Sequence, residues 1–520
     1  MAQRTWGGLG MAALLLAACS DEIAPPDAAT TTGDDLATSV DGAPPDMGAP
    51  INDAAADAAV ADAAVADASL GVTLPNGAIG WTFHGPQSGA PSRIFGASFD
   101  GGGNLWAAGG EEGLFVLPAG ASRFRRFTMQ DGLRPYGWMA DGTDPPGGKY
   151  LKVISVAGGP AGTVFAGYQG KPPAPGQLDC ESNWDGPNPD PAIYKSGDAD
   201  RVSLDGNGIK VVHYDIFSGP GVCAEMRGRE KVCDILRLRY DPVTNRVWFG
   251  GNHGFAMGWA DYQGNAHCQW GKTPIAPVPS VKTDPYNNEY GHAGCSGVLE
   301  HAHPAINTYY KDGSCCALST GDYFGVAIDP TSHDVWFAGY LRATRFKYGT
   351  SGNDYYTAQS RTEDPPYRSN RIDVWPDAVV EPDIPTPQQR TDDLLSGAAA
   401  MGDGSVWVTS FEHGAAHIDP GGAVVERLST REGLPTDRYA AAAADPLDGS
   451  VWLGTNHGPG VVRLRGGAIT VYGEATFGQD LAWEGVTDIQ SSGSGGGRKM
   501  IVSFAGDGAH AGAVGIYSGP

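Results

Sequence analysis

Positive charge is scarce in this chain, which has 35 Lys and Arg against 59 Asp and Glu over 520 residues and a formal net charge of −24. A chain this acidic repels phosphate backbones, so we expect no nucleic-acid partner. The apolar run 11–18 is too short to span a bilayer as a mature helix. A GxSxG elbow, a P-loop and an HExxH motif are all missing, so the standard signatures of serine hydrolases, nucleotide sites and zinc proteases are absent from the sequence.

Glycine and proline are abundant instead, with 77 and 38 residues, while charged residues make up only 18%. Both residue types break helices and punctuate strands. The composition therefore favours many short strands joined by tight turns. At 520 residues the chain is long enough for a large core or several smaller ones.

The N-terminus reads MAQRTWGGLGMAALLLAACSDE, with a positive Arg4 before the apolar run. Its end, LAAC at 16–19, resembles the lipobox of bacterial lipoproteins. The resemblance implies removal of a signal peptide, residues 1–18, and lipidation of Cys19, which would anchor the protein to a membrane in the cell envelope. Ser20 in place of Asp favours the outer membrane of a Gram-negative cell. The alternative is an ordinary secretory signal followed by a chance cysteine.

Residues 20–77 contain eleven acidic residues and no Lys or Arg, and the stretch DAAADAAVADAAVADAS at 53–69 has low complexity. Few of these side chains are large enough to build a core. We therefore expect residues 19–77 to form a flexible, self-repelling tether.

One pattern recurs along residues 78–520: a strand of small or apolar residues, an Asp/Gly turn, a strand centred on an aromatic residue, a Gly break and another strand. Clear copies are FDGGGNLWAAGGEEGLFVL and ADPLDGSVWLGTNHGPGVV. Seven copies can be aligned, with their central positions at Trp106, Phe165, Trp248, Trp336, Trp407, Trp452 and Met500. We expect this series to be core, because one large side chain per unit fills the gap between twisted sheets.

The two shortest spacings between these positions are 45 and 48 residues, the length of a four-stranded propeller blade. The sequence therefore predicts an all-β fold, a seven-bladed β-propeller with insertions near 170–230, 260–320 and 346–392. Six of the seven cysteines after Cys19 fall in the first two insertions, with Cys233 just past the edge. In an exported protein they are expected to form disulfides, whose connectivity the sequence does not determine.

Two further stretches concern how the ring is joined. FRRFTMQDGL (124–133) and VERLSTREGLP (425–435) are typical of an outer strand followed by a fixed connector. GWTFHGPQSG (80–89) resembles such an outer strand but precedes the first unit, and the last unit lacks one. We therefore predict that Trp81 to His84 completes the final blade and closes the ring.

Together, DGNLW or DGSVWLGT, then NHG or EEG, then a polar strand ending in DGL or EGLP resemble the two-component regulator propeller repeat. The resemblance covers most of residues 78–520 and is clearest in the first, fifth and sixth units. It implies seven-bladed propellers that often serve as extracytoplasmic sensors of histidine kinases. We expect no kinase or DNA-binding segment after the last unit of this chain.

Three histidines share one position of the repeat, between its second and third strands: His253, His413 and His457. The first unit has Glu112 there. If these side chains converge on the central channel, they could bind a ligand or metal or act as acid and base groups. The competing interpretation is a structural turn before glycine, where several polar residues would serve.

A second histidine cluster lies in GHAGCSGVLEHAH, residues 291–303. His301 and His303 would point the same way in an extended segment, with His292 nearby, so a metal site is a hypothesis here. Its spacing matches no established zinc motif, and a solvated loop is the alternative. We expect no other cofactor.

The favoured function is a non-catalytic, surface-anchored propeller that binds a ligand or an envelope protein in a sensor-like way. The main alternative is a propeller enzyme using the histidines, for instance a lyase similar to virginiamycin B lyase, with which the likeness concerns the fold alone. The third hypothesis is a structural or adhesive envelope protein without a small ligand.

Overall fold

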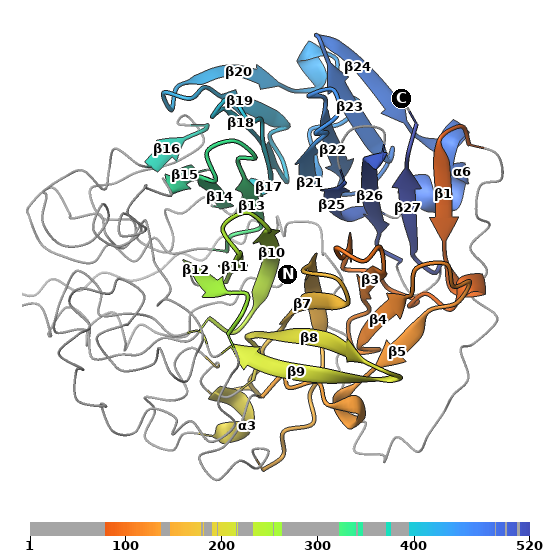
Figure 1. The fold of residues 1–520 in the computed structure, drawn as a ribbon. Coiled ribbons are helices and arrows are strands. Elements are labelled where there is room, and N and C mark those ends of the chain that lie inside the picture. Colours follow the sequence, from red (N-terminus) through yellow and green to blue (C-terminus); the bar gives the residue numbers. More distant parts are fainter. Residues whose placement is uncertain are drawn as a thin grey trace, which may run out of the picture.

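The computed structural model describes residues 78–136, 146–177, 180, 190–194, 196–214, 216, 232–252, 254–262, 322–339, 342–346, 371–375, 395–483, 485–493, 497–506 and 510–519. The predicted signal peptide and tether, with Cys19, lie outside these residues. Within them, seven antiparallel sheets form a ring (Figure 1). The seven-bladed propeller predicted from the repeats is confirmed.

The first three blades follow one another from the N-terminal side, and their strands run from the ring axis outward in chain order. Blade 1 contains β2 (Gly96–Phe99), β3 (Leu105–Ala108), β4 (Leu114–Leu117) and β5 (Arg125–Phe127). Blade 2 contains β6 (Val153–Gly158), β7 (Thr163–Tyr168), β8 (Ala199–Asp205) and β9 (Gly208–Tyr214). Blade 3 contains, among the described residues, β10 (Ile235–Asp241), β11 (Arg246–Gly251) and β12 (Gly254–Trp259).

The remaining blades complete the ring. Blade 4 contains β13 (Gly325–Ile328), β14 (Val335–Gly339), β15 (Arg342–Phe346) and β16 (Arg371–Asp373). Blade 5 contains β17 (Leu395–Ala400), β18 (Val406–Ser410), β19 (Ala415–Ile418) and β20 (Val424–Leu428). Blade 6 contains β21 (Tyr439–Ala444), β22 (Val451–Thr455), β23 (Val461–Arg465) and β24 (Ala468–Tyr472). Blade 7 contains β25 (Val486–Ser492), β26 (Lys499–Phe504), β27 (Ala513–Tyr517) and β1 (Trp81–His84).

Blade 7 is closed by the two ends of the propeller. β1 pairs antiparallel with β27, with Trp81 opposite Tyr517 and His84 opposite Val514. In Figure 1 the orange β1 lies beside the dark blue β27. The predicted closing strand is therefore confirmed, and β27 leaves no open edge on that side.

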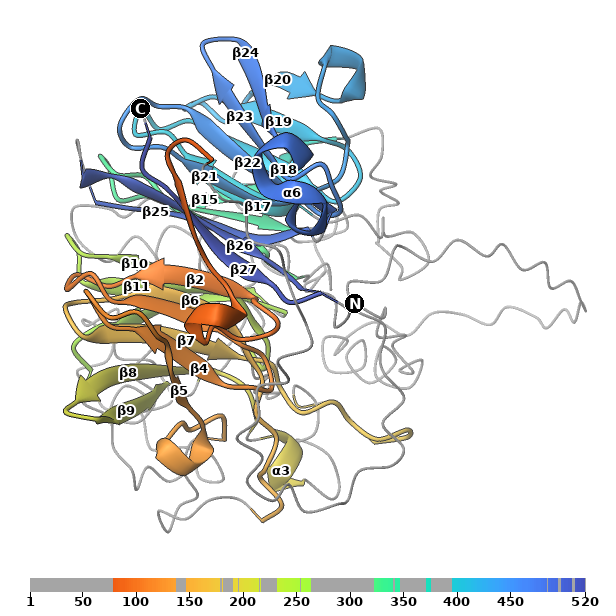
Figure 2. The same ribbon diagram turned by 90° about the vertical axis from the view of Figure 1, so that its right-hand side faces the viewer.

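Seven hydrophobic cores hold the blades together, one between each pair of neighbours. Turned by 90°, the sheets of successive blades stack as layers (Figure 2). In blades 1 to 6 the predicted aromatic packs against the next blade, as Trp106 does against blade 2. In blade 7 the prediction was one residue off: Met500 packs toward blade 6, while Ile501 packs toward blade 1. Neighbouring strand residues point to opposite faces, so Ile501 is the true equivalent.

In blade 1, an aspartate organises the hairpin between β2 and β3. Asp100 accepts hydrogen bonds from the backbone N–H of Gly102 at 2.7 Å and from Trp106 Nε1 at 2.9 Å. It also accepts one from Gly162 N–H in the next blade at 3.1 Å. An aspartate at the same place starts the turns of blades 3, 4 and 6, accepting from the backbone two residues on: Asp241, Asp329 and Asp445. The repeated Asp therefore fixes the turn, as Asx-turns do.

Short helices lie mostly in the connections: η1 (Pro86–Ser88), η2 (Met129–Asp131), α3 (Pro191–Tyr194), η5 (Thr430–Glu432) and α6 (Glu474–Trp483). η2 and η5 are the predicted fixed connectors, each held by a capping box, from Thr128 to Asp131 and from Ser429 to Glu432. None of the helices in the described part of the chain is long and apolar enough to cross a membrane.

Only part of the predicted insertion near 170–230 lies outside the strands of blade 2. It contains β8 and β9, so the third and fourth strands of blade 2 lie inside a region that was expected to be extra sequence. The one near 346–392 likewise contains β16. Insertion 260–320 lies almost wholly outside the described residues. A disulfide joins Cys180 to Cys233, with their Cα atoms 6.2 Å apart and both side chains buried, so one disulfide is present among the predicted cysteines.

Candidate functional site

The order of the strands sets which loops share one end of the ring. In a four-stranded antiparallel blade, the loop between the second and third strands lies at the same end as the connector to the next blade. We call this end the connector face, and the opposite end, with the hairpins between strands one and two, the hairpin face. Glu112, His413 and His457 all lie on the connector face, in blades 1, 5 and 6.

Glu112 is committed to the structure of its blade. Its carboxylate accepts hydrogen bonds from the backbone N–H of Ser92 at 2.7 Å and from Ser92 Oγ at 2.5 Å. Ser92 belongs to the connector from blade 7 into blade 1, so Glu112 fastens that connector. Its backbone carbonyl accepts a hydrogen bond from Arg126 Nε at 2.5 Å.

Replacing Glu112 by alanine is expected to lower the free energy of unfolding by about 1–2 kcal/mol, because two hydrogen bonds to a half-buried carboxylate are lost. The matched control is Glu111→Ala. Glu111 is 58% exposed and makes an ion pair of 3.3 Å with Lys152, so about 0.5 kcal/mol or less is expected. Urea unfolding of both variants measures the difference. Equal losses would show that Glu112 does not fasten the connector.

His413 belongs to a turn after β18. The Oγ of Ser410 accepts hydrogen bonds from the backbone N–H groups of Glu412 at 3.0 Å and His413 at 2.9 Å. The imidazole of His413 lies 5.5 Å from the indole of Trp375, which follows β16 of blade 4. This histidine therefore takes part in the contact between blades 4 and 5.

His457 is exposed on the connector face. The backbone N–H of Asn456 donates to the carbonyl of Arg438 at 3.1 Å, which brings the His457 turn against the connector from blade 5. Partial desolvation, and next the positive charge of Arg438, lower the pKa of His457. At neutral pH its imidazole is therefore in the neutral form, able to accept a hydrogen bond from a ligand.

The remaining predicted site residues, His253, His292, His301 and His303, lie outside the described residues. Within the parts that the structure describes, no three His, Cys, Asp or Glu side chains are grouped so that they could hold a metal ion. The three described members of the repeat position each lie in the loop of their own blade. They remain predicted ligand-binding residues.

The innermost strands of blades 3 and 7 are joined by buried charges that the sequence did not reveal. Arg237 on β10 lies 2.6 Å from the carboxylate of Asp488 on β25. Arg239, also on β10, lies 2.9 Å from the same carboxylate. The amide of Gln490 donates to Asp488 at 2.7 Å and to the carbonyl of Val156 in blade 2, also at 2.7 Å. We call Arg237, Arg239, Asp488 and Gln490 the axial network.

Both arginines of this network are also bound to backbone carbonyls. Arg237 donates through Nε to Phe324 at 2.8 Å and through both terminal nitrogens to Thr487 at 3.1 Å. The network therefore reaches blades 2, 3, 4 and 7. Burial acts to raise the pKa of Asp488, but the two guanidinium groups outweigh it and hold the pKa below its usual range. Asp488 is thus a buried carboxylate anion.

Hydroxyl groups add a second set of links at the same end of the inner strands. Each donates to a carbonyl at the start of the next inner strand: Ser155 to Ile235 at 2.6 Å, Ser396 to Tyr439 at 2.6 Å and Thr487 to Ile94 at 2.9 Å. Irregular register at these strand starts, as between Val153 and Ser155, aims the side chains at the neighbouring blade. The connector end of the ring axis is therefore a region of dense polar contacts between blades.

Blade 2 buries a second polar cluster near the connector face. His213 Nδ1 lies 2.8 Å from Asp200, and Nε2 lies 3.6 Å from Asp198. The phenol of Tyr168 donates to Asp200 at 2.5 Å. Burial, and next the charge of Asp200, raise the pKa of Tyr168, so it stays protonated as a donor. The sequence does contain a signal for the first pair, because DADRVSLDGNGIKVVHYD reads as a hairpin that places Asp200 opposite His213.

No protein-family model matches the sequence, and no curated protein does either. Solved structures similar to it include one titled "YCF48 bound to D1 peptide", with 11% identity, a TM-score of 0.42 and coverage of 85% of this chain and 97% of that chain. Another is the WD40 β-propeller domain of Doa1, with 9% identity, a TM-score of 0.41 and the same coverages. The two-component regulator propeller repeat therefore stays a resemblance of motifs, and neither structure carries a ligand or partner over to this chain.

Proposed function

We propose that this chain is a lipid-anchored propeller of the cell envelope that binds a ligand or partner protein on its connector face and performs no catalysis there. The observation that supports the proposal most is that polar side chains at this end of the ring bind other parts of the ring. Glu112 fastens a connector, and the axial network occupies four side chains of the inner strands. In the part of this face that the structure describes, exposed loop side chains are available to a partner.

Among the described residues, such exposed side chains include those on the loops of blades 5 and 6. They carry both charges and an imidazole: Glu412, Arg431, Glu432, Arg438 and His457. Mixed charges around a neutral imidazole suit a polar recognition surface, where rim charges set partner choice. Propeller folds serve many functions, so the side chains of this face and not the fold carry the proposal.

The binding half of the proposal can be tested by photo-crosslinking in intact cells. A photoreactive residue at Glu412 or at His457 is expected to give a discrete adduct. The matched controls place it at Val243 and Leu447, which are 72% and 44% exposed on the hairpin face. Equal adducts from both faces, or adducts from the hairpin face alone, would contradict the choice of face.

The anchoring half requires lipid on Cys19. Metabolic labelling with an alkyne fatty acid is expected to mark the wild-type chain and to leave Cys19→Ala unlabelled and in the soluble fraction. Cys19→Ser serves as the conservative control, since a hydroxyl is not a substrate for thioether lipidation. Labelling that persists in both variants would contradict lipidation at this residue.

A further inference from the structure

The outer edge of blade 1 concentrates positive charge in an otherwise acidic chain. Arg123 and Arg126 are exposed and Arg125 is half-buried, on the turn before β5 and on β5 itself. No acidic residue occurs between residues 113 and 130. Residues 78–520 as a whole carry a formal charge of −14, so this local sign is the reverse of the ring's. We call Arg123, Arg125 and Arg126 the basic edge.

Two members of the basic edge are held in place by neighbours. Arg125 lies over the ring of Phe127, 5.3 Å from its centroid, and donates to the carbonyl of Asn207 in blade 2. Arg126 donates through Nε to the carbonyl of Glu112. A guanidinium has five N–H donors, so these contacts orient each group while further donors remain for a carboxylate.

The acidic segment of the chain leads into β1, whose far end lies close to this edge. It ends at residue 77, and residues 78–80 lead into β1. Just after β1, the carbonyl of Ser88 accepts a hydrogen bond from the backbone N–H of Phe124 at 2.8 Å, next to Arg123. The rings of His84 and Phe124 also lie 6.2 Å apart. The end of β1 and the turn that follows it are thus in contact with Phe124, which lies between Arg123 and Arg125.

The acidic segment is long enough to reach the basic edge. Asp67 precedes Ala78 by eleven residues, and an extended stretch of that length spans at most about 40 Å. Further toward the N-terminus, at spacings of four or five residues, lie Asp62, Asp57 and Asp53. Several carboxylates can therefore reach the edge together. Because the segment is linked to the ring, its effective concentration at the edge is in the millimolar range (about 1 mM or more).

We propose that the acidic segment, residues 20–77, docks through its carboxylates on the basic edge of blade 1. The charge of the rest of the ring disfavours other docking places, and the segment itself contains no Lys or Arg to pair with. Docking would draw the ring toward the N-terminal end of the chain, and rising ionic strength would release it. The Debye length falls from about 10 Å at 0.1 M salt to about 3 Å at 1 M. This inference depends neither on the lipid nor on the connector face.

Photo-crosslinking in the purified full-length chain tests it. A photoreactive residue at Ser122, exposed beside Arg123, is expected to form adducts with residues 20–77 at low salt, about fivefold more than at roughly 1 M salt. The matched control is Ala468, which is exposed at the corresponding turn of blade 6. Adducts there are expected at the high-salt level. Peptide mapping by mass spectrometry identifies the crosslinked residues.

Two charge variants complete the test. One carries Arg123→Gln, Arg125→Gln and Arg126→Gln; the other carries Asp53→Asn, Asp57→Asn, Asp62→Asn and Asp67→Asn, which leaves the ring unchanged. Each is expected to reduce the Ser122 adducts to the Ala468 level. Adducts that are equal at both positions, or unaffected by salt and by the aspartate variant, would overturn the proposal. So would an absence of adducts together with arginine-dependent binding to phosphatidylglycerol vesicles, which would make the basic edge a membrane-facing surface.

Discussion

Replacing Asp488 by alanine is expected to lower the free energy of unfolding by about 3–5 kcal/mol, because it leaves two arginines buried without their counter-charge. Arg237 and Arg239 are 6% and 17% exposed, so solvent cannot take the place of the carboxylate. Urea unfolding followed by tryptophan fluorescence measures the change. The variant should also unfold less cooperatively, since the axial network joins four blades.

An exposed ion pair provides the control. Asp205 and Lys210 in the outer hairpin of blade 2 lie 3.1 Å apart and are 57% and 75% exposed. Asp205→Ala is expected to cost less than about 1 kcal/mol. If Asp488→Ala costs no more than Asp205→Ala, the axial network does not hold the ring.

Low pH is expected to destabilise the protein by protonating the carboxylate of Asp488. The pKa of Asp488 is lowered in the folded protein, so its contribution is present above the pKa of the unfolded chain, about 3.9. The contribution is lost as the pH falls through the lower folded pKa. The Asp488→Asn variant should therefore show a flatter loss of stability below about pH 4 than the wild type.

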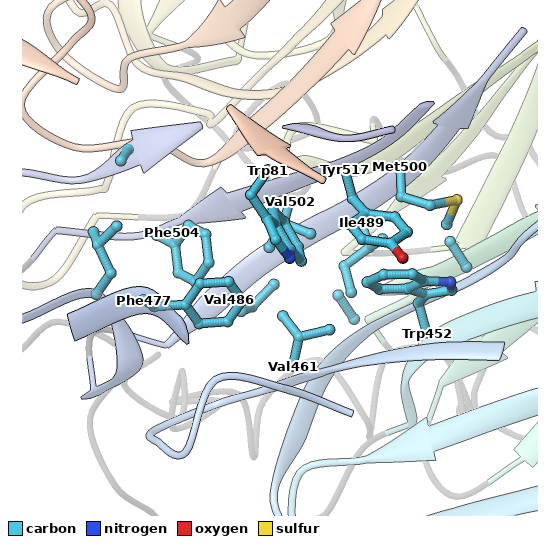
Figure 3. Packing of buried hydrophobic residues seen from close by; sticks show 14 of the residues in the cluster. Trp81, Trp452, Val461, Phe477, Val486, Ile489, Met500, Val502, Phe504 and Tyr517 are labelled. Carbon is cyan, nitrogen blue, oxygen red and sulfur yellow. The ribbon is translucent and has the colours of Figure 1, made fainter. Parts of the chain in front are cut away.

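The second large effect is expected from Trp81→Ala in the closing strand, which should destabilise the protein by about 3–5 kcal/mol. The indole of Trp81 lies 4.9 Å from Phe477, 5.2 Å from Tyr517 and 5.9 Å from Trp452, ring centroid to ring centroid. Figure 3 shows it in the middle of this cluster. Its removal leaves a cavity between blades 6 and 7 and weakens the pairing of β1 with β27.

Thr82→Ala is the matched control on the same strand. Thr82 is exposed, so a change within about 0.5 kcal/mol is expected. Thermal unfolding measures both variants, and size-exclusion chromatography detects oligomers, because a detached β1 would expose the edge of β27. A monomeric Trp81→Ala protein with wild-type stability would show that β1 does not hold the ring closed.

The parts of the fold that depend on neighbouring residues can be predicted from the sequence. The Asp-Gly turns, the aromatic strands and the capped connectors recur in the sequence because each hairpin is organised by residues a few positions apart, as Asp100 is with Trp106. The closing strand could be predicted because GWTFHG repeats the pattern of an outer strand and stands where no blade precedes it. Its partner, β27, was identified by the missing strand of the last unit.

Two features cannot be predicted in this way: which of two neighbouring apolar residues faces the next blade, and which strands belong to a blade when a long stretch of sequence separates them. Met500 and Ile501 are both apolar, and only the packing of the folded ring shows that the first contacts blade 6 and the second contacts blade 1. β8 and β9 were assigned to an insertion because residues 169–198 separate them from β7. Glu112 and His457 occupy the same position of the repeat, yet Glu112 binds a connector while His457 is exposed.

The sequence by itself determined the number of blades, the turns within them and the strand that closes the ring, because these depend on short-range alternation and turn chemistry. The tertiary structure alone decided which polar groups meet at the axis. Arg237 and Asp488 are 251 positions apart, and only the curvature of seven twisted sheets brings their strands face to face. It likewise decided that the end of β1 lies beside Phe124, between the arginines of blade 1. Charges act through space, and only the folded ring sets those distances.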